Sequence, residues 1–150
     1  MREAVDEAIE NIVDGAPVDW RTVERHAAEE GKDAWAADLR IIHDVANFYR
    51  LSAYSTYTPA PADYADPTSE EPTVEVVVGE AQAAKYQAAL RQLARAERHA
   101  VIGRLELLTS YSDLAAVLGY QYRNTREAAI AARRAVTRAL KRLAIEMGHV

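Results

Sequence analysis

The segment Gly119–Arg142, "GYQYRNTREAAIAARRAVTRALKR", decides the fold expected for this chain because its residues sort onto two faces of a helix. Starting at Arg126, each residue turns about 100° around the helix axis. Apolar residues then fall within an arc of about 80°, and basic residues occupy a separate arc of roughly 180°. The apolar face consists of Ala129, Ala132, Val136, Leu140, Leu143 and Met147. The basic face consists of Arg126, Arg133, Arg134, Arg138, Lys141 and Arg142. The pattern predicts an amphipathic helix of about twenty residues with a basic outer face.

The residues that precede this helix predict a second helix and a turn. Ser110 is a good N-cap, and the small Ala115 allows a following helix to cross closely. Gly119 stands where the end of a helix needs a left-handed residue, and Asn124 is a good N-cap for the basic helix. The side chains expected to face inward from the first helix are Leu114, Val117 and Leu118. Two helices joined in this way are typical of a helix-turn-helix unit.

A basic second helix in a helix-turn-helix unit indicates DNA binding. We expect its N-terminal end to enter the major groove, where arginine pairs with guanine and asparagine pairs with adenine. Basic residues farther along the helix are expected to contact phosphates. The candidate DNA-binding residues are Arg123, Asn124, Thr125, Arg126, Arg133, Arg134 and Arg138. The simpler alternative is a helical protein whose arginine-rich face is only solvated.

The charge of the chain is divided between its two halves. The whole sequence of 150 residues has 18 Lys and Arg against 23 Asp and Glu. Residues 1–80 hold 6 basic and 18 acidic side chains, a net charge of −12, whereas residues 81–150 hold 12 and 5, a net charge of +7. This asymmetry suggests two units with different roles and an anionic partner for the second.

The N-terminal unit, residues 1–51, is predicted to be a small acidic helical module. Its helices are expected at Glu3–Val13, from Asp19 to just before Gly31, and from Lys32 to about Arg50. The third helix carries an apolar stripe made of Trp35, Leu39, Ile42, Ala46 and Tyr49. Residues 52–73 hold four of the five prolines and are predicted to be a linker.

The C-terminal unit, residues 74–150, is predicted to be a helix-turn-helix domain, so that the fold class is all-α. The run "VEVVV" at Val74–Val78 has no partner strand and is expected to join the start of the next helix. Further helices are predicted at Glu80–Leu93 and Arg95–Leu108. The first has Tyr86, Ala89, Leu90 and Leu93 on one side, and the second carries Ala100, Val101, Leu105 and Leu108.

From about Val74 to its C-terminus the chain resembles region four of bacterial extracytoplasmic-function sigma factors. The matching stretches are "VVVGEAQAAKYQAALRQLARAERHAVIGRLEL" (Val76–Leu107), "SYSDLAAVLGY" (Ser110–Tyr120) and "AARRAVTRALKRLAIEM" (Ala131–Met147). The resemblance implies binding to the promoter −35 element and contact with the core of RNA polymerase. Two departures stand out. The stretch after Gly119 is about six residues longer than the family pattern, nearly two turns if helical, and residues 1–50 do not resemble the promoter-melting region two.

These observations predict a cytoplasmic transcription regulator that binds DNA and lacks the promoter-melting region. The alternative is an adaptor that binds RNA polymerase or a sigma factor through the same fold without touching DNA. We expect no enzyme activity, no cofactor, no metal site and no membrane span, because the sequence lacks cysteine, a glycine-rich phosphate loop and a long apolar run. A further hypothesis is that the acidic N-terminal unit folds back over the basic helix and competes with DNA.

Overall fold

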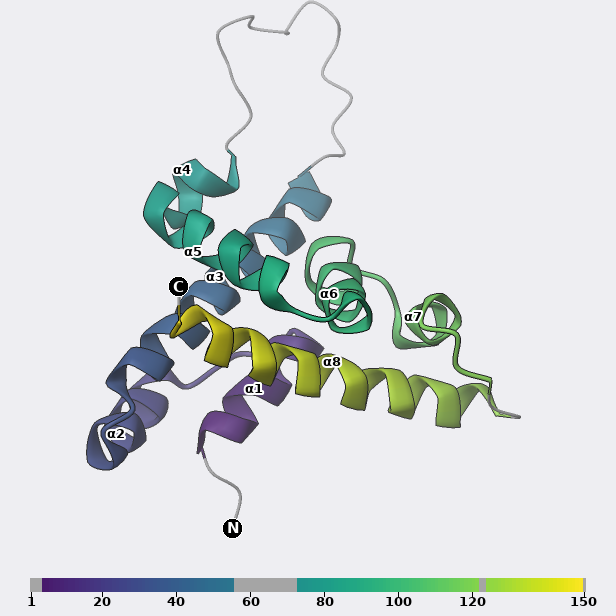
Figure 1. Cartoon of the computed structure of the whole chain (residues 1–150), viewed down its shortest axis with the longest axis horizontal. Coiled ribbons are helices and arrows are strands. Elements are labelled where there is room, and N and C mark those ends of the chain that lie inside the picture. Colours follow the sequence, from purple (N-terminus) through teal and green to yellow (C-terminus); the bar gives the residue numbers. More distant parts are fainter. Residues whose placement is uncertain (1–3, 56–72, 122–123, 150) are drawn as a thin grey trace, which may run out of the picture.

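The computed structural model describes residues 4–55, 73–121 and 124–149, which are helical apart from short connections (Figure 1). The all-α prediction is confirmed, and no strand occurs in these ranges. The helices are α1 (Ala4–Asp14), α2 (Trp20–Glu30), α3 (Asp33–Ser55), α4 (Val74–Val78), α5 (Glu80–Gln92), α6 (Arg95–Val101), α7 (Tyr111–Val117) and α8 (Thr125–Met147). A π-helical turn, Ile102–Glu106, follows α6 directly. Within the described part of the chain, no helix combines the length and apolarity needed to cross a bilayer.

The three N-terminal helices begin and end close to the predicted residues. Asp19 caps α2 by accepting a hydrogen bond from the backbone N–H of Thr22, and Gly31 ends it at a φ of +70°. The third helix continues five residues beyond Arg50 to Ser55, so the first residues of the predicted linker 52–73 are helical. Residues 56–72 of that linker lie outside the described residues. Of the predicted stripe, Leu39, Ile42 and Ala46 are buried, and Trp35 and Tyr49 pack against the core with partial exposure.

The run at Val74–Val78 is helical, but it forms a separate helix instead of joining the next one. Thr73 caps α4 by accepting a hydrogen bond from the backbone N–H of Val76. Gly79 then separates α4 from α5 at a φ of +108°, a backbone conformation that other residues rarely adopt. The helix α5 follows the prediction, since Tyr86, Ala89 and Leu90 on its inner side are buried.

The helix predicted at Arg95–Leu108 is interrupted at its C-terminal end. The π-helical turn replaces its last part, and Leu108 adopts a φ of +54° with an exposed fraction of 36%. The predicted helix to Leu108 is therefore too long, because regular α-helix ends at Val101 and Leu108 has a left-handed backbone. Gly103 in the turn allows α7 to approach, since a Cβ atom at Gly103 would lie 2.8 Å from Cδ1 of Leu114.

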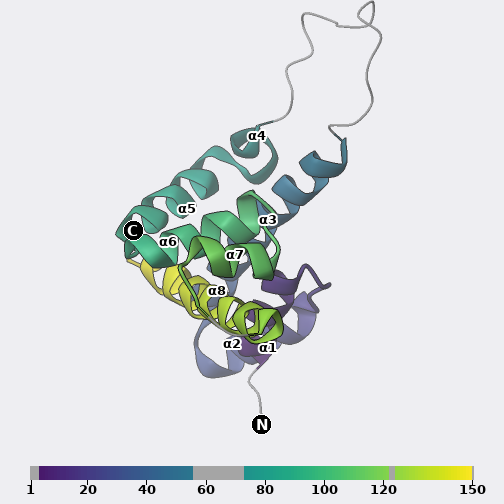
Figure 2. The same cartoon turned by 90° about the vertical axis from the view of Figure 1, so that its right-hand side faces the viewer.

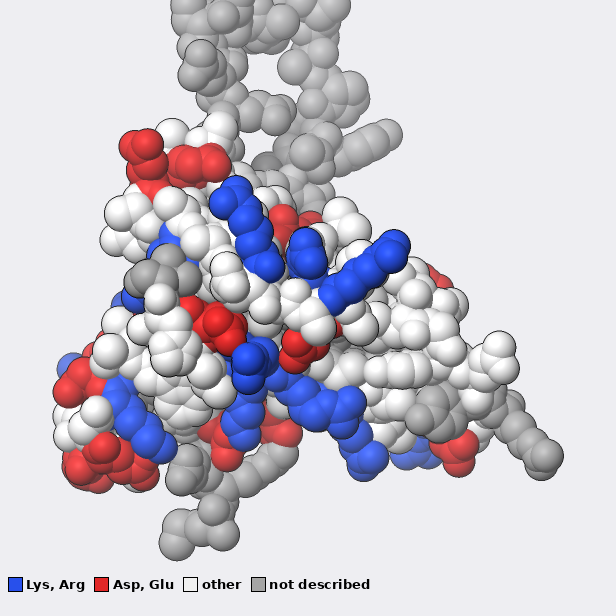
Figure 3. Space-filling model, viewed as in Figure 1, with Lys and Arg blue, Asp and Glu red and all other residues white. Residues whose placement is uncertain are grey.

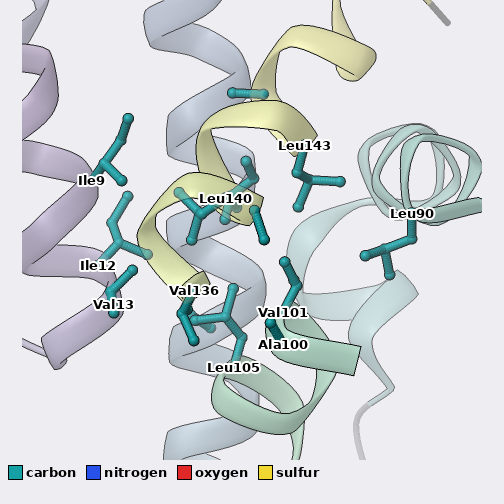
Figure 4. Close-up of a cluster of buried hydrophobic side chains, with 14 of the residues drawn as sticks. Ile9, Ile12, Val13, Leu90, Ala100, Val101, Leu105, Val136, Leu140 and Leu143 are labelled. Atoms are coloured by element: carbon teal, nitrogen blue, oxygen red, sulfur yellow. The ribbon is translucent and has the colours of Figure 1, made fainter. Parts of the chain in front are cut away.

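Helices from both sides of the predicted linker share one hydrophobic core. The last helix, α8, contacts α1, α3, α5, α6 and α7. Figure 4 shows Ile9, Ile12 and Val13 of α1 on one side of Val136 and Leu140 of α8, with Leu90 and Val101 on the other. A smaller cluster between the first three helices consists of Ala8, Val23, Ala27 and Ala36. In the described residues, therefore, the N-terminal and C-terminal halves are packed as one helical unit.

Candidate nucleic-acid interface

The predicted two-helix corner is present at α7 and α8. The Ser110 hydroxyl accepts a hydrogen bond from the backbone N–H of Asp113 at 3.2 Å, and Gly119 adopts a φ of +78° after α7. Asn124 Oδ1 accepts a hydrogen bond from the backbone N–H of Arg126 at 2.8 Å. Both N-caps and the left-handed glycine are therefore confirmed. Ala115 is buried and α7 packs against α8, as the small side chain suggested.

One of the three residues that were predicted to face inward from α7, Val117, does not do so. Leu114 is fully buried and Leu118 is partly buried against the core, but Val117 is 65% exposed. The helix has only seven residues, and its buried side is centred between Leu114 and Ala115. Val117 lies about 60° from Leu114, on the side away from Ala115, and therefore faces solvent.

The two faces of α8 are separated as the periodicity predicts. Of the predicted apolar face, Ala132, Val136, Leu140, Leu143 and Met147 are buried, and Ala129 is half-buried. The N-terminal end of α8 lies beside α7 at the right-hand edge of the molecule in Figure 1. Figure 2 shows the same end from the front, with α7 and the first turns of α8 toward the viewer. The corner thus presents the first half of α8 at the surface.

Three exposed arginines on this face have no ion-pair partner among the described residues. The guanidinium groups of Arg126, Arg134 and Arg138 form no ion pair with any described residue, and we call these three the arginine row. With a rise of 1.5 Å per residue, the row extends about 18 Å along the helix axis. Thr125 is also exposed, and Arg123 lies outside the described residues. Of the predicted site residues, Thr125 and the arginine row are therefore exposed on α8.

Asn124 and Arg133 differ from the predicted roles because the protein itself uses their polar atoms. Asn124 caps α8 through Oδ1, the atom that a bidentate contact with adenine would also need. Arg133 Nε and Nη2 donate to the two carboxylate oxygens of Asp14 at 2.9 and 2.7 Å, and Nη1 lies 3.9 Å from Glu10 Oε1. Arg133, for which a phosphate contact was predicted, therefore forms an ion pair with α1 in this structure.

The ion pair is part of a small network that the sequence analysis missed. The Tyr111 hydroxyl donates to Asp14 and to the carbonyl oxygen of Val13, at the N-terminal end of α7. The Arg133 hydrogen bond is the main cause that lowers the pKa of Asp14, and burial is the main cause that raises the pKa of Tyr111 to about 12. Asp14 thus holds α1, α7 and α8 together at one point.

The acidic side of α1 covers part of the basic arc. Asp6, Glu10 and Asp14 recur every four residues, and Lys141 Nζ lies 2.8 Å from Asp6 Oδ1. Figure 3 shows basic side chains along the line of α8 with acidic side chains next to them. On α8 the paired basic residues, Arg133 and Lys141, are eight residues apart. The matching spacings on the two helices are the sequence signal that could have identified the contact between α1 and α8.

The acidic cover is a fixed part of the fold. The other side of α1 places Val5, Ile9, Ile12 and Val13 in the shared core, each with an exposed fraction of 2% or less. Burying a side chain of this kind stabilises the fold by about 1.5–3 kcal/mol. Detaching α1 would therefore expose a large part of the core. The contact agrees with the hypothesis that the N-terminal unit folds back over α8. However, α1 is anchored in the shared core, so it cannot leave α8 without exposing core side chains.

Replacing Asp14 with Asn is expected to lower the free energy of unfolding by about 1 kcal/mol at pH 7, because a partly exposed charge-assisted pair is lost. The folded protein depresses the pKa of Asp14, so the contribution is present above the ordinary value of 3.8 and disappears as the pH falls through the folded-state pKa. Urea unfolding between pH 3 and pH 7 should show the two proteins converging at the acidic end. Asp113→Asn, an exposed change on α7, is the control, and a pH-independent difference for Asp14→Asn would contradict the assignment.

The described residues contain no group of three or more His, Asp or Glu side chains that could hold a metal ion. Comparisons with protein-family models, with curated proteins and with solved structures found no significant match to this chain.

Proposed function

We propose that this protein is a DNA-binding transcription regulator of the cytoplasm that contacts DNA through α7 and α8. It would act as a region-four-like module without a promoter-melting region, with the promoter and the core of RNA polymerase as partners. The observation that supports the proposal best is the arginine row, Arg126, Arg134 and Arg138, on the outer face of the second helix of a capped corner. The chain has an excess of acidic residues, yet none of those described pairs with the row.

The dimensions of the helix suit this role. An α-helix with its side chains is about 10–12 Å wide, and the major groove of B-DNA is about 12 Å wide. In this arrangement Arg126, near the N-terminus of α8, reaches base edges. Arg134 and Arg138 lie one turn apart, about 6 Å along the axis, and contact phosphates.

The acidic residues of α1 give the docking a direction. Asp6, Glu10 and Asp14 lie beside the basic arc and neutralise Lys141 and Arg133. A phosphate backbone is repelled by carboxylates and attracted by the unpaired guanidinium groups. DNA would therefore approach α8 from the side of the arginine row that faces away from α1.

Fluorescence anisotropy with labelled duplex DNA at several salt concentrations tests the proposal. The affinity of the wild-type protein should fall steeply with salt, because bound counterions are released from DNA. Arg134→Ala/Arg138→Ala should weaken binding to all sequences by about tenfold and reduce the salt slope by about two. Arg126→Ala should instead weaken the preference for particular bases.

The matched control is Arg91→Ala/Arg95→Ala, which removes two exposed arginines from α5 and α6. Its loss of DNA affinity relative to the wild type should be much smaller than the loss in the Arg134 and Arg138 variant. Equal losses for the two double variants would mean that only net charge matters. Unchanged binding in the Arg134 and Arg138 variant would place any DNA site elsewhere.

A second candidate function is an adaptor that binds RNA polymerase or a sigma factor without touching DNA. The observation in its favour is apolar exposure near the corner, since Val117 is 65% exposed and Leu107 is 70% exposed. DNA binding gives no role to these two side chains. Absence of salt-dependent DNA binding, together with loss of polymerase binding in Val117→Asp, would favour the adaptor.

A further inference from the structure

A cavity lies between the C-terminal ends of α1 and α3 and the segment that follows α6. Its volume is about 380 Å³, within the range of small-molecule sites. Two arginines, Arg50 of α3 and Arg104 of the π-helical turn, line it. The apolar part of the lining comes from Val13, Ala53, Leu105 and Leu108.

Both arginines keep unused hydrogen-bond donors. Arg104 Nε donates to the Val13 carbonyl at 2.9 Å and Nη1 donates to the Thr109 carbonyl at 3.1 Å, while Nη2 has no partner among the described residues. Arg50 makes one long hydrogen bond within the described residues, from Nη1 to Asn47 Oδ1 at 3.3 Å. A guanidinium has five N–H donors, so each group can still bind an anion.

The acid in the cavity wall attracts Arg104 electrostatically but is hydrogen-bonded to neither cavity arginine. Asp14 also lines the cavity, but its oxygens accept hydrogen bonds from Arg133 and Tyr111. Arg104 is fixed over the Tyr111 ring, with Cζ 4.0 Å from the ring centroid. Two cations therefore share one cavity without a carboxylate that is bonded to either, an arrangement that a bound anion would stabilise.

The backbone at this cavity is unusual for an ordinary structural loop. Leu108 adopts a φ of +54°, which costs about 1–3 kcal/mol for a residue other than glycine. The π-helical turn, which ends two residues before Leu108, contains Arg104 and Leu105 of the cavity wall. Both features occur often at functional sites.

We propose that this cavity binds a small anion with an apolar body, of which an aromatic carboxylate is the simplest form. Arg50 forms the bidentate contact with the carboxylate and Arg104 Nη2 gives a further hydrogen bond. Leu105 and Leu108 cover the apolar body. No residue of the arginine row lines this cavity, so the proposal is independent of DNA binding.

Isothermal titration calorimetry on the full chain tests the site with benzoate, acetate and inorganic phosphate as probes. Benzoate should bind saturably with one site per chain, and acetate and phosphate should bind at least tenfold more weakly, because they lack the apolar body. Arg50→Gln should weaken benzoate binding at least tenfold, and Arg50→Lys, which keeps the charge without the fork, should weaken it several-fold. Arg91→Gln, on the exposed side of α5, should change nothing.

The proposal is overturned if benzoate gives no saturable heat. It is also overturned if Arg50→Gln and Arg50→Lys, shown to be folded by circular dichroism, bind benzoate as the wild type does. Phosphate binding as tight as that of benzoate would overturn the assignment of an apolar body. Failure of DNA binding in the anisotropy experiment has no bearing on these outcomes.

Discussion

Replacing Ile9 with alanine should lower the free energy of unfolding of the whole chain by about 3 kcal/mol, within the usual range for a large-to-small change in a core. Ile9 is fully buried on α1 and belongs to the same cluster as Val136 and Leu140 of α8. A cavity at this point removes contacts from both the N-terminal and the C-terminal helices. The loss should therefore appear in one cooperative transition that includes α8.

Urea unfolding followed by two signals distinguishes this outcome from its alternative. Trp20 and Trp35 report on the N-terminal helices by fluorescence, and far-ultraviolet circular dichroism reports on all helices. The control is Ile145→Ala, because Ile145 is 45% exposed on α8, and its effect should stay within about 1 kcal/mol. Two separate transitions, of which only the first moves in Ile9→Ala, would contradict the shared core and favour separate modules at 1–51 and 74–150.

The features that the sequence predicted well are those determined by neighbouring residues. Helix ends at Asp19, Ser110 and Asn124 depend on a side chain and a backbone N–H two or three residues away. Gly119 needs only its own backbone freedom. The core face of α8 follows from its periodicity, which is also local.

The features that escaped prediction depend on residues far apart in the chain. The pair between Arg133 and Asp14 joins positions 119 residues apart, so the local pattern of α8 left Arg133 on its outer face. The predicted helix to Leu108 and the predicted inward position of Val117 were wrong for a different reason. A π-helical turn replaces the end of the first helix, and the second helix has only seven residues. The sequence therefore predicted the basic face of α8, but it did not predict which arginines on that face lack an ion-pair partner among the described residues.

The second large effect concerns the ion pair between α3 and α5. Asp38 is a buried charged residue with an exposed fraction of 2%, and Lys85 Nζ lies 2.6 Å from its Oδ1. Lys85→Met removes the cation and leaves the carboxylate buried without it, which is expected to cost about 3 kcal/mol of unfolding free energy. Chemical unfolding at pH 7 measures this loss.

Two further variants show whether the loss comes from burial of an unpaired charge. Asp38→Leu/Lys85→Met should regain most of the stability, because no charge is then left in the interface. Lys141→Met is the matched control, since it breaks a pair of similar length, 2.8 Å, in which both side chains are more than a third exposed. An exposed pair contributes about 0–1 kcal/mol, so this control should be nearly neutral. Equal losses of unfolding free energy in Lys85→Met and Lys141→Met would show that the contact between α3 and α5 does not depend on a desolvated carboxylate. Solvent would then reach Asp38 more freely than its burial indicates.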